Sequence, residues 1–207
     1  MNLGLAATTF AIVIPAELPD KTFISAVILS SRHRPLPVWG GTAAGLLVQA
    51  ALAVVAGRAL ALAPQRVVEA VVAAAFLAGA AYLLLVPERS AERAGAQIAE
   101  QGEVRVVRAG ARTPGEAPWP RVALSTFALV VLAELGDLTQ VVIANLAARS
   151  ADALSVFVGA AVAFVLVSGL GVATGRSLVR VVPLEALRKL SGLVLLGFGV
   201  WSALRAA

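Results

Sequence analysis

The chain has 207 residues, 59% of them hydrophobic and 14% charged, with a net charge of +5 and a mean hydropathy of +0.89. Because a soluble domain carries roughly 25% charged residues, this composition excludes a soluble enzyme with its own catalytic domain and predicts a bundle of membrane helices. The lack of cysteine and the single histidine, His33, exclude thiolate metal sites, disulfide scaffolds and histidine clusters for zinc, copper or haem.

The first apolar segment runs from Leu3 to Leu29 and is long enough for a membrane span, which takes roughly 20 residues. Three charged residues lie near its centre: Glu17, Asp20 and Lys21. No basic residue precedes the segment and it lacks a clear cleavage site of small residues. We therefore expect a retained membrane span and not a signal peptide.

Two segments without charge follow. Pro35–Gly57 has 23 residues and Ala70–Pro87 has 18, so each is predicted to cross the hydrocarbon core as a helix. The polar segment Glu88–Pro120 comes next, with five glutamates and five arginines. It contains the tripeptide Thr113-Pro114-Gly115 and few large apolar residues, which is typical of a mobile tether with room for a short surface helix.

The second part of the chain repeats this order. Val122–Ala147 is apolar with Glu134 and Asp137 in its middle, Ala153–Gly175 carries no charge, and a last helix is expected from Leu184 to Leu204. The sequence therefore predicts an all-α integral membrane protein with six transmembrane helices. Residues 1–86 and 121–207 are expected to hold three spans each, with a polar linker over residues 87–120.

Basic residues predict the orientation. With the N-terminus outside, twelve arginines and lysines fall in the inside loops, and four arginines fall outside: Arg58, Arg66, Arg149 and Arg205. The positive-inside rule then places both termini outside and the linker in the cytoplasm, most simply in a bacterial plasma membrane. The rule also explains the positive net charge without a nucleic-acid partner.

A short motif occurs twice, 117 residues apart. Ala16–Thr22 reads Ala-Glu-Leu-Pro-Asp-Lys-Thr, and Ala133–Thr139 reads Ala-Glu-Leu-Gly-Asp-Leu-Thr. Because each half holds an odd number of spans, the second half would enter the membrane from the opposite side. Two inverted three-helix repeats are a common transporter architecture, with the binding site at the midplane where discontinuous helices meet. The first and fourth spans would then bring the two acidic motifs together.

The acidic residues themselves predict a cation or proton site. Glu and Asp three residues apart share one helical face, and carboxylates at membrane depth are costly unless they have a function. Lys21 is four residues after Glu17 and is expected to pair with it, but one lysine cannot neutralise Glu17, Asp20, Glu134 and Asp137. The remaining negative charge indicates a bound cation, protons, or the two in exchange.

The available ligands are oxygens, which suit Mn²⁺, Ca²⁺ and Mg²⁺. Pro15 and Pro19 remove helical N–H groups, so carbonyls of the first span can face an ion. Asn145 is eleven residues after Glu134 and is expected on nearly the same helical face. The supporting oxygen donors expected near the site are Thr22, Thr139, Gln140 and Asn145, with Gln49 and Ser168 either around it or in ordinary hydrogen bonds between helices.

The doubled motif resembles the Glu-x-Gly-Asp-(Lys/Arg)-(Thr/Ser) signature of the GDT-one family, also called uncharacterised protein family 0016. The resemblance covers essentially the whole chain and implies a manganese/calcium–proton exchanger. It implies that Glu17, Asp20, Glu134 and Asp137 bind the cation, with Lys21, Thr22 and Thr139 at motif positions and no permanently bound cofactor. Pro19 and Leu138 depart from the signature, where the family has a glycine and a basic residue.

The favoured function is a secondary transporter that exports a divalent cation, Mn²⁺ first and Ca²⁺ second, in exchange for protons through a carboxylate site at the midplane. An exporter of small cationic metabolites would use the same carboxylates, but it would need a roomier cavity with aromatic walls, and this chain is only 5% aromatic. An intramembrane aspartyl protease is a poorer alternative. Its Gly-x-Gly-Asp motif is matched only by Leu135-Gly136-Asp137, and the Tyr-Asp motif is missing.

Overall fold

The computed structural model describes the chain except for residues 19, 63, 86–87, 109–116, 175–183 and 207. Pro19, the tripeptide Thr113-Pro114-Gly115 and Gly175 therefore lie outside the described residues. The residues that it describes form helices and their connections, with no strand among them. In chain order the helices are α1 Leu3–Glu17, α2 Lys21–Arg32, α3 Pro35–Leu60, α4 Gln65–Leu85, α5 Glu88–Arg108, α6 Trp119–Ala133, α7 Leu138–Arg149, α8 Ala153–Thr174 and α9 Leu184–Ala206.

Three described helices are long and apolar enough to cross a membrane: Pro35–Leu60, Arg66–Leu85 and Ala153–Ala173. The pair α6 and α7 passes the same test as one segment bent by 74°. α1 and the Gly192–Arg205 part of α9 are apolar but shorter. The chain is therefore an all-helical protein with three or four candidate spans, and the expected six spans depend on joining α1 to α2 and on counting α9.

Both segments with central acidic residues are broken at those residues. α1 ends at Glu17 and α2 begins at Lys21, while α6 ends at Ala133 and α7 begins at Leu138. The second break contains Gly136 with a φ of +79°, a conformation that glycine adopts without a steric penalty. These breaks agree with the expectation that discontinuous helices meet at the acidic motifs.

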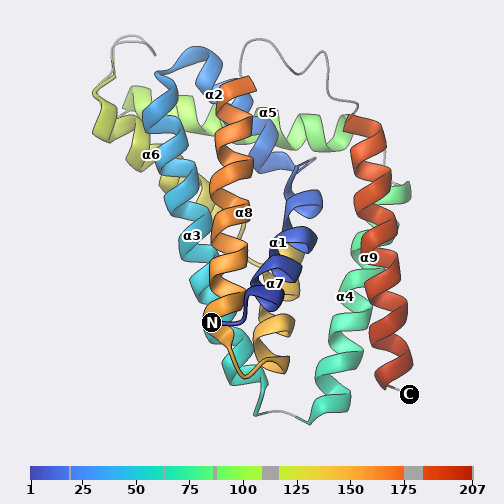
Figure 1. Cartoon of the computed structure of the whole chain (residues 1–207). Coiled ribbons are helices and arrows are strands. Elements are labelled where there is room, and N and C mark those ends of the chain that lie inside the picture. The colour runs from blue at the N-terminus through green and yellow to red at the C-terminus, as the bar shows by residue number, and fades with distance from the viewer. Residues whose placement is uncertain (19, 63, 86–87, 109–116, 175–183, 207) are drawn as a thin grey trace.

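The breaks lie inside the bundle because α1 and α7 are surrounded by longer helices (Figure 1). The largest core cluster joins α1, α3, α6, α7 and α8 through fully buried residues such as Val13, Leu46, Val130, Ile143 and Phe164. α4 and α9 pack side by side at one edge of the bundle (Figure 1). Burial of these apolar side chains fixes where the broken helices meet.

Two close helix contacts use equivalent residues of the two halves. Gly41 of α3 packs against the Ala123 carbonyl and Thr126 of α6, so tightly that an added Cβ would collide with the carbonyl. Gly159 of α8 packs in the same way against Ala6 and Thr9 of α1. The partners are 117 or 118 residues apart in the sequence, so the α3–α6 contact is repeated by the α1–α8 contact.

The polar segment after α4 contains a long helix and not only a short one. α5 has 21 residues and lies across one end of the bundle, where it packs on α2 and α6 (Figure 1). Its small residues Gly95, Ala99 and Gly102 have the spacing of one helical face. Gly95 contacts Ile24 and Gly102 contacts Leu29 and Leu129, which explains why this polar helix packs so closely.

Candidate metal centre

Carboxylates from both halves of the chain meet where the helices are broken. Glu17 is the last residue of α1, Glu134 caps the end of α6, and Asp137 caps the start of α7. One carboxylate oxygen of each lies within 4.8 Å of the other two. Oxygens that bind one Ca²⁺ at about 2.3–2.6 Å are separated by up to about 5 Å. The three carboxylates are therefore close enough to bind a single ion together.

The two acidic motifs have the same backbone turn. The Asp20 N–H donates to the Glu17 carbonyl at 3.1 Å, and the Asp137 N–H donates to the Glu134 carbonyl at 3.1 Å. Asp20 and Asp137 both have extended backbone and precede a new helix. The expectation that Glu and Asp share a helical face is wrong, because a helix ends between them; the turn brings them to the site instead.

Threonine hydroxyls cross between the two halves. Thr22 donates a hydrogen bond to the Glu134 carboxylate, and Thr139 donates one to Glu17. Both threonines and both glutamates are buried, with at most 5% of each residue exposed. Each glutamate is thus oriented by a threonine from the other half of the chain.

Lys21 contacts three carboxylates of the cluster. Its Nζ lies 3.1 Å from Asp137 Oδ1, 3.6 Å from Glu134 Oε1 and 3.8 Å from Asp20 Oδ2. The expected pairing of Lys21 with Glu17 is wrong, because α1 ends at Glu17 and the i,i+4 geometry of a helix does not apply. Asp20 Oδ2 is buried and accepts no hydrogen bond from the described residues.

Gln140 holds the second break together. Its Nε2 donates to the Glu134 carbonyl at 2.8 Å and to the side chain of Gln49, while its Oε1 accepts from the Gly136 N–H at 3.2 Å. Gln49 of α3 in turn donates to the Val131 carbonyl. These two glutamines satisfy backbone groups that the end of α6 would otherwise leave unpaired.

Asn145 and Ser168 lie in other surroundings. Asn145 lines a cavity between α1, α7 and α9. It was expected on the same helical face as Glu134, but the 74° bend between α6 and α7 separates the two residues into different helices. Ser168 is buried in α8 and donates to the Val165 carbonyl at 3.1 Å. This hydrogen bond is that of an ordinary helical serine.

Two cavities border the carboxylates. A cavity of about 180 Å³ is lined by Asp20, Lys21, Asp137 and Thr139 and is bounded toward α5 by Ala94. Another, of about 520 Å³, is reached by Asp137, Gln49 and Gln140 and has mostly apolar walls from α3 and α4. Leu138, which replaces the basic residue of the family signature, lines the smaller cavity.

A family model described as "Divalent cation/proton antiporter GDT1" matches residues 5–91 and 122–207, which include both acidic motifs. The chain belongs to the GDT1 family. Membership makes it a membrane transporter and not an enzyme, as the sequence predicted.

Three relatives match most of the chain. A protein of Vibrio cholerae named "Putative manganese exporter" is 32% identical over 94% of this chain and 86% of its own length. A GDT1-like protein of Synechocystis is 28% identical over 92% of each chain, and "GDT1-like protein 3" of Arabidopsis thaliana is 27% identical over 98% of this chain and 74% of its own length. No solved structure matches the chain.

The signal for the helix breaks was present in the sequence. Pro19 lacks the N–H that a continuing helix needs, and Gly136 occupies the equivalent position in the second motif. Two helix breakers directly between Glu and Asp predict a turn at that point better than a shared helical face. No comparable signal singles out the roles of Gln49 and Gln140, which depend on how three helices pack.

Proposed function

We propose that this GDT1-family protein exports a divalent cation in exchange for protons, with Mn²⁺ as the first candidate and Ca²⁺ as the second. The meeting of Glu17, Glu134 and Asp137 within 4.8 Å is the observation that carries the proposal. The donors around them are oxygens, which suit hard and borderline cations. The name of the Vibrio cholerae relative supports manganese as the first ion to test.

The proposed cation ligands are the carboxylates of Glu17, Asp20, Glu134 and Asp137. Asp20 adds a fourth carboxylate whose buried Oδ2 accepts no hydrogen bond from the described part of the chain. Supporting roles follow from the contacts: Thr22 and Thr139 orient the glutamates, Lys21 lowers the net negative charge, and Gln49 and Gln140 hold the second break. Asn145 and Ser168 have no role in this ligand set.

Charge balance couples the cation to protons. Four carboxylates near one lysine, buried in a medium of low dielectric, cannot all stay ionised when the cation leaves. The empty site therefore takes up protons, and a cation that binds must displace them. A carrier that changes face only when its site is filled by metal or by protons exchanges one for the other.

The repeated contacts support a pair of inverted halves, residues 1–86 and 121–207, joined by the polar linker of residues 87–120. In this arrangement α1 with α2 forms the first of six spans, and α6 with α7 forms the fourth. The Gly41 and Gly159 contacts and the crossed threonines are what two such halves would produce. Rocking of one half against the other would then expose the shared site to each side in turn.

The proposed orientation has both termini outside a bacterial plasma membrane and α5 in the cytoplasm. Arg32 lies at the end of the bundle where α5 packs, and it binds Glu103 of α5. Arg58 and Arg149 belong to the opposite end, near the connection between α7 and α8. The surplus of basic residues on the α5 side agrees with the positive-inside rule.

The cavities beside the carboxylates favour an ion over a cationic metabolite. The cavity beside Asp20 and Asp137 has about 180 Å³, and among the described residues Tyr82 is the one aromatic residue that lines it. The cavity of about 520 Å³ that Asp137 also borders is larger, but no aromatic residue is among the described residues that line it. Pockets for drug-sized ligands usually have about 300–1,000 Å³ and aromatic walls. A bare or partly hydrated cation fits the smaller space.

Ion uptake into proteoliposomes with an imposed pH gradient tests the proposed function. We expect Mn²⁺ and Ca²⁺ to move against the proton gradient, with Mg²⁺ slower because it releases water reluctantly. Glu134→Gln should abolish this movement, while Glu100→Gln, the same change at an exposed residue of α5, should leave it intact. Metal uptake that does not depend on the pH gradient would overturn the proposal. Equally fast transport of a small amine in place of the metal would also overturn it.

A further inference from the structure

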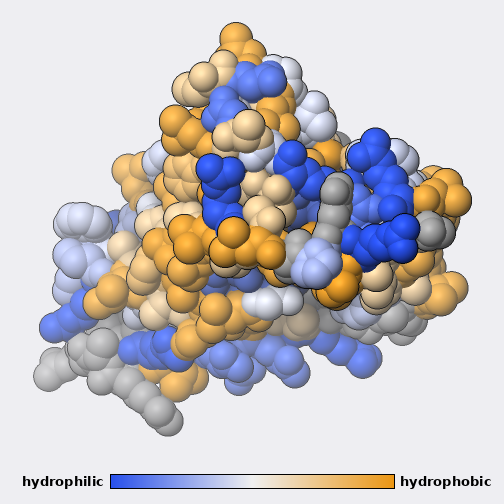
Figure 2. Space-filling view, turned by 90° about the horizontal axis from the view of Figure 1, so that it is seen from below, coloured by the Kyte–Doolittle hydropathy of each residue, from blue (hydrophilic) through white to orange (hydrophobic). Residues whose placement is uncertain are grey.

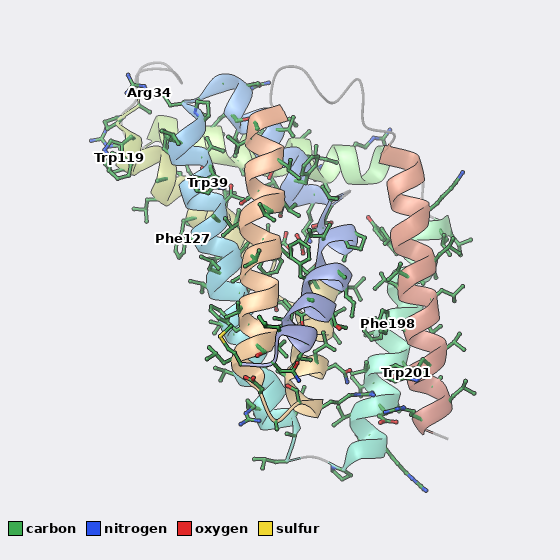
Figure 3. All side chains as sticks on the ribbon, in the orientation of Figure 1. Arg34, Trp39, Trp119, Phe127, Phe198 and Trp201 are labelled. Carbon is green, nitrogen blue, oxygen red and sulfur yellow. The ribbon has the colours of Figure 1, made fainter. Side chains whose placement is uncertain are left out.

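Two arginines meet at the end of the bundle opposite α5. Arg149 ends α7 and Arg205 lies in the last turn of α9. Their guanidinium carbons lie 5.5 Å and 4.3 Å from the centre of the Trp201 ring. Figure 3 shows Trp201 toward this end of α9, and hydrophilic residues gather on the α4 and α9 side when the molecule is seen from this end (Figure 2). Two cations therefore share one aromatic ring.

These arginines line two neighbouring cavities. One, of about 240 Å³, lies between α1, α7 and α9 and has Asn145, Arg149, Ser150 and Arg205 in its wall. The other, of about 350 Å³, shares both arginines and adds Glu69. Glu69 is the one carboxylate among the residues that line the two cavities, so the two arginines leave a net positive charge.

Several buried donors in the first cavity lack a hydrogen-bond partner among the described residues. They are Asn145 Nδ2, Arg149 Nε and Nη1, and Ser150 Oγ. Asn145 is only 5% exposed, so solvent at the surface does not satisfy its amide. A buried donor without a partner is costly and rare. Donors of this kind around one cavity point to a ligand that only accepts hydrogen bonds, which is an anion.

In the first half of the chain, the arginine equivalent to Arg149 has a closer carboxylate partner. This is Arg32, 117 residues earlier and also in the last turn of its helix. Arg32 Nη1 lies 2.7 Å from both carboxylate oxygens of Glu103. The contact of Arg149 Nη2 with Glu69 Oε1 is 3.7 Å, which is too long for a hydrogen bond. Arg149 thus has a longer ion pair with Glu69, and its Nη2 donates to Ser202 Oγ at 3.2 Å. Its Nε and Nη1 remain available to an anion.

We propose that the cavity between α1, α7 and α9 binds an anionic phosphate group through Arg149, Arg205 and Asn145. The planar guanidinium group matches phosphate oxygens with two parallel hydrogen bonds. The phosphate is either free in solution or part of a lipid headgroup, because the chemistry of recognition is the same. The site is separate from the carboxylate cluster and stands whether or not the proposed transport function is right.

The test uses the full chain in detergent. Inorganic phosphate is compared with chloride at equal ionic strength by thermal stability, and phosphatidylglycerol is compared with phosphatidylcholine by native mass spectrometry. We expect saturable stabilisation by phosphate, selective retention of phosphatidylglycerol, or both. Phosphate alone identifies the free ion as the ligand, and phosphatidylglycerol alone identifies the lipid. An absence of both effects overturns the proposal.

Three variants locate the binding. Arg149→Lys should weaken it about tenfold or more, because it loses the paired hydrogen bonds of the guanidinium. Asn145→Leu should weaken it as well while the protein stays at least as stable, since it removes a buried unpaired amide. Arg105→Gln, an exposed arginine of α5, is the control for charge and should change nothing. If Asn145→Leu folds and binds as the wild type does, the proposed site is wrong, even if Arg149→Lys does not fold.

Discussion

Thr22 donates its hydroxyl hydrogen bond to Glu134, a residue that lies 112 positions later in the other half of the chain. Thr139 makes the reciprocal contact with Glu17. Neither half therefore orients its own glutamate. The proposed cation site is a shared structure, and a relative movement of the halves must change it.

Thr22→Val should lower the affinity for Mn²⁺ roughly tenfold, because a hydrogen bond to a charged group contributes about 1.5–3 kcal/mol. Thr139→Val should have a similar effect, since its contact is equivalent. Thr22→Ser keeps the hydroxyl and is the matched control. Calorimetric titration of the purified protein measures the affinities, and wild-type affinity in both valine variants would contradict the crossed arrangement.

Leu138→Lys should weaken Mn²⁺ binding by at least about tenfold. Leu138 lines the cavity beside Asp20, Lys21 and Asp137, so its replacement adds a second positive charge there. A unit positive charge about 8 Å from a divalent ion costs about 4 kcal/mol at an effective dielectric constant of about 20. Leu138→Met, which is neutral and similar in length, should bind Mn²⁺ normally in the same titration. Tighter binding in the lysine variant would show that the ion lies elsewhere.

Gly41→Ala and Gly159→Ala should both destabilise the protein, by similar amounts. In each case the new Cβ would collide with a backbone carbonyl of the neighbouring helix. Gly40→Ala is the control, because nothing lies within 4 Å of a Cβ at that position. Thermal unfolding in detergent measures the effect. A variant of Gly41 as stable as the Gly40 variant would contradict the close packing of α3 on α6.

The acidic motifs show how far the sequence could predict the site. Their repetition was enough to predict that Glu17, Asp20, Glu134 and Asp137 come from two related segments, and the structure places carboxylates of both segments together. The prediction that Glu and Asp of each motif share a helical face was wrong, because helical periodicity applies only within one helix. Contacts such as that of Lys21 with Asp137 depend on the turn between the helices, which a helical wheel does not represent.

The polar segment shows a second limit. The composition of Glu88–Pro120 indicates a linker. Composition does not depend on the order of residues, so it cannot show that three small residues stand at helical spacing. Gly95, Ala99 and Gly102 form a face that fits against α2 and α6. Long apolar runs, by contrast, predict α3 and α8 closely: Pro35 begins α3, where proline fits the first turn.

The proposed orientation is testable by cysteine labelling, because the chain has no natural cysteine. Arg105→Cys on α5 should react with a membrane-impermeant maleimide only from the cytoplasmic side. Leu62 lies between α3 and α4 and is 90% exposed, so Leu62→Cys should react only from outside. The measurement compares intact cells with inside-out vesicles, and labelling of both positions from one side would contradict the inverted arrangement.

Proton release on binding Mn²⁺ is the most direct test of cation–proton exchange at the carboxylate cluster. Mn²⁺ is added to the detergent-solubilised protein in weakly buffered solution near neutral pH, and the pH change is recorded together with the bound metal. We predict that the solution becomes more acidic as the site fills. Glu17→Gln or Glu134→Gln should nearly abolish the release, while Glu100→Gln should retain it. Binding of Mn²⁺ to the wild-type cluster with no release of protons across this pH range would contradict the exchange mechanism and indicate a channel or uniporter instead.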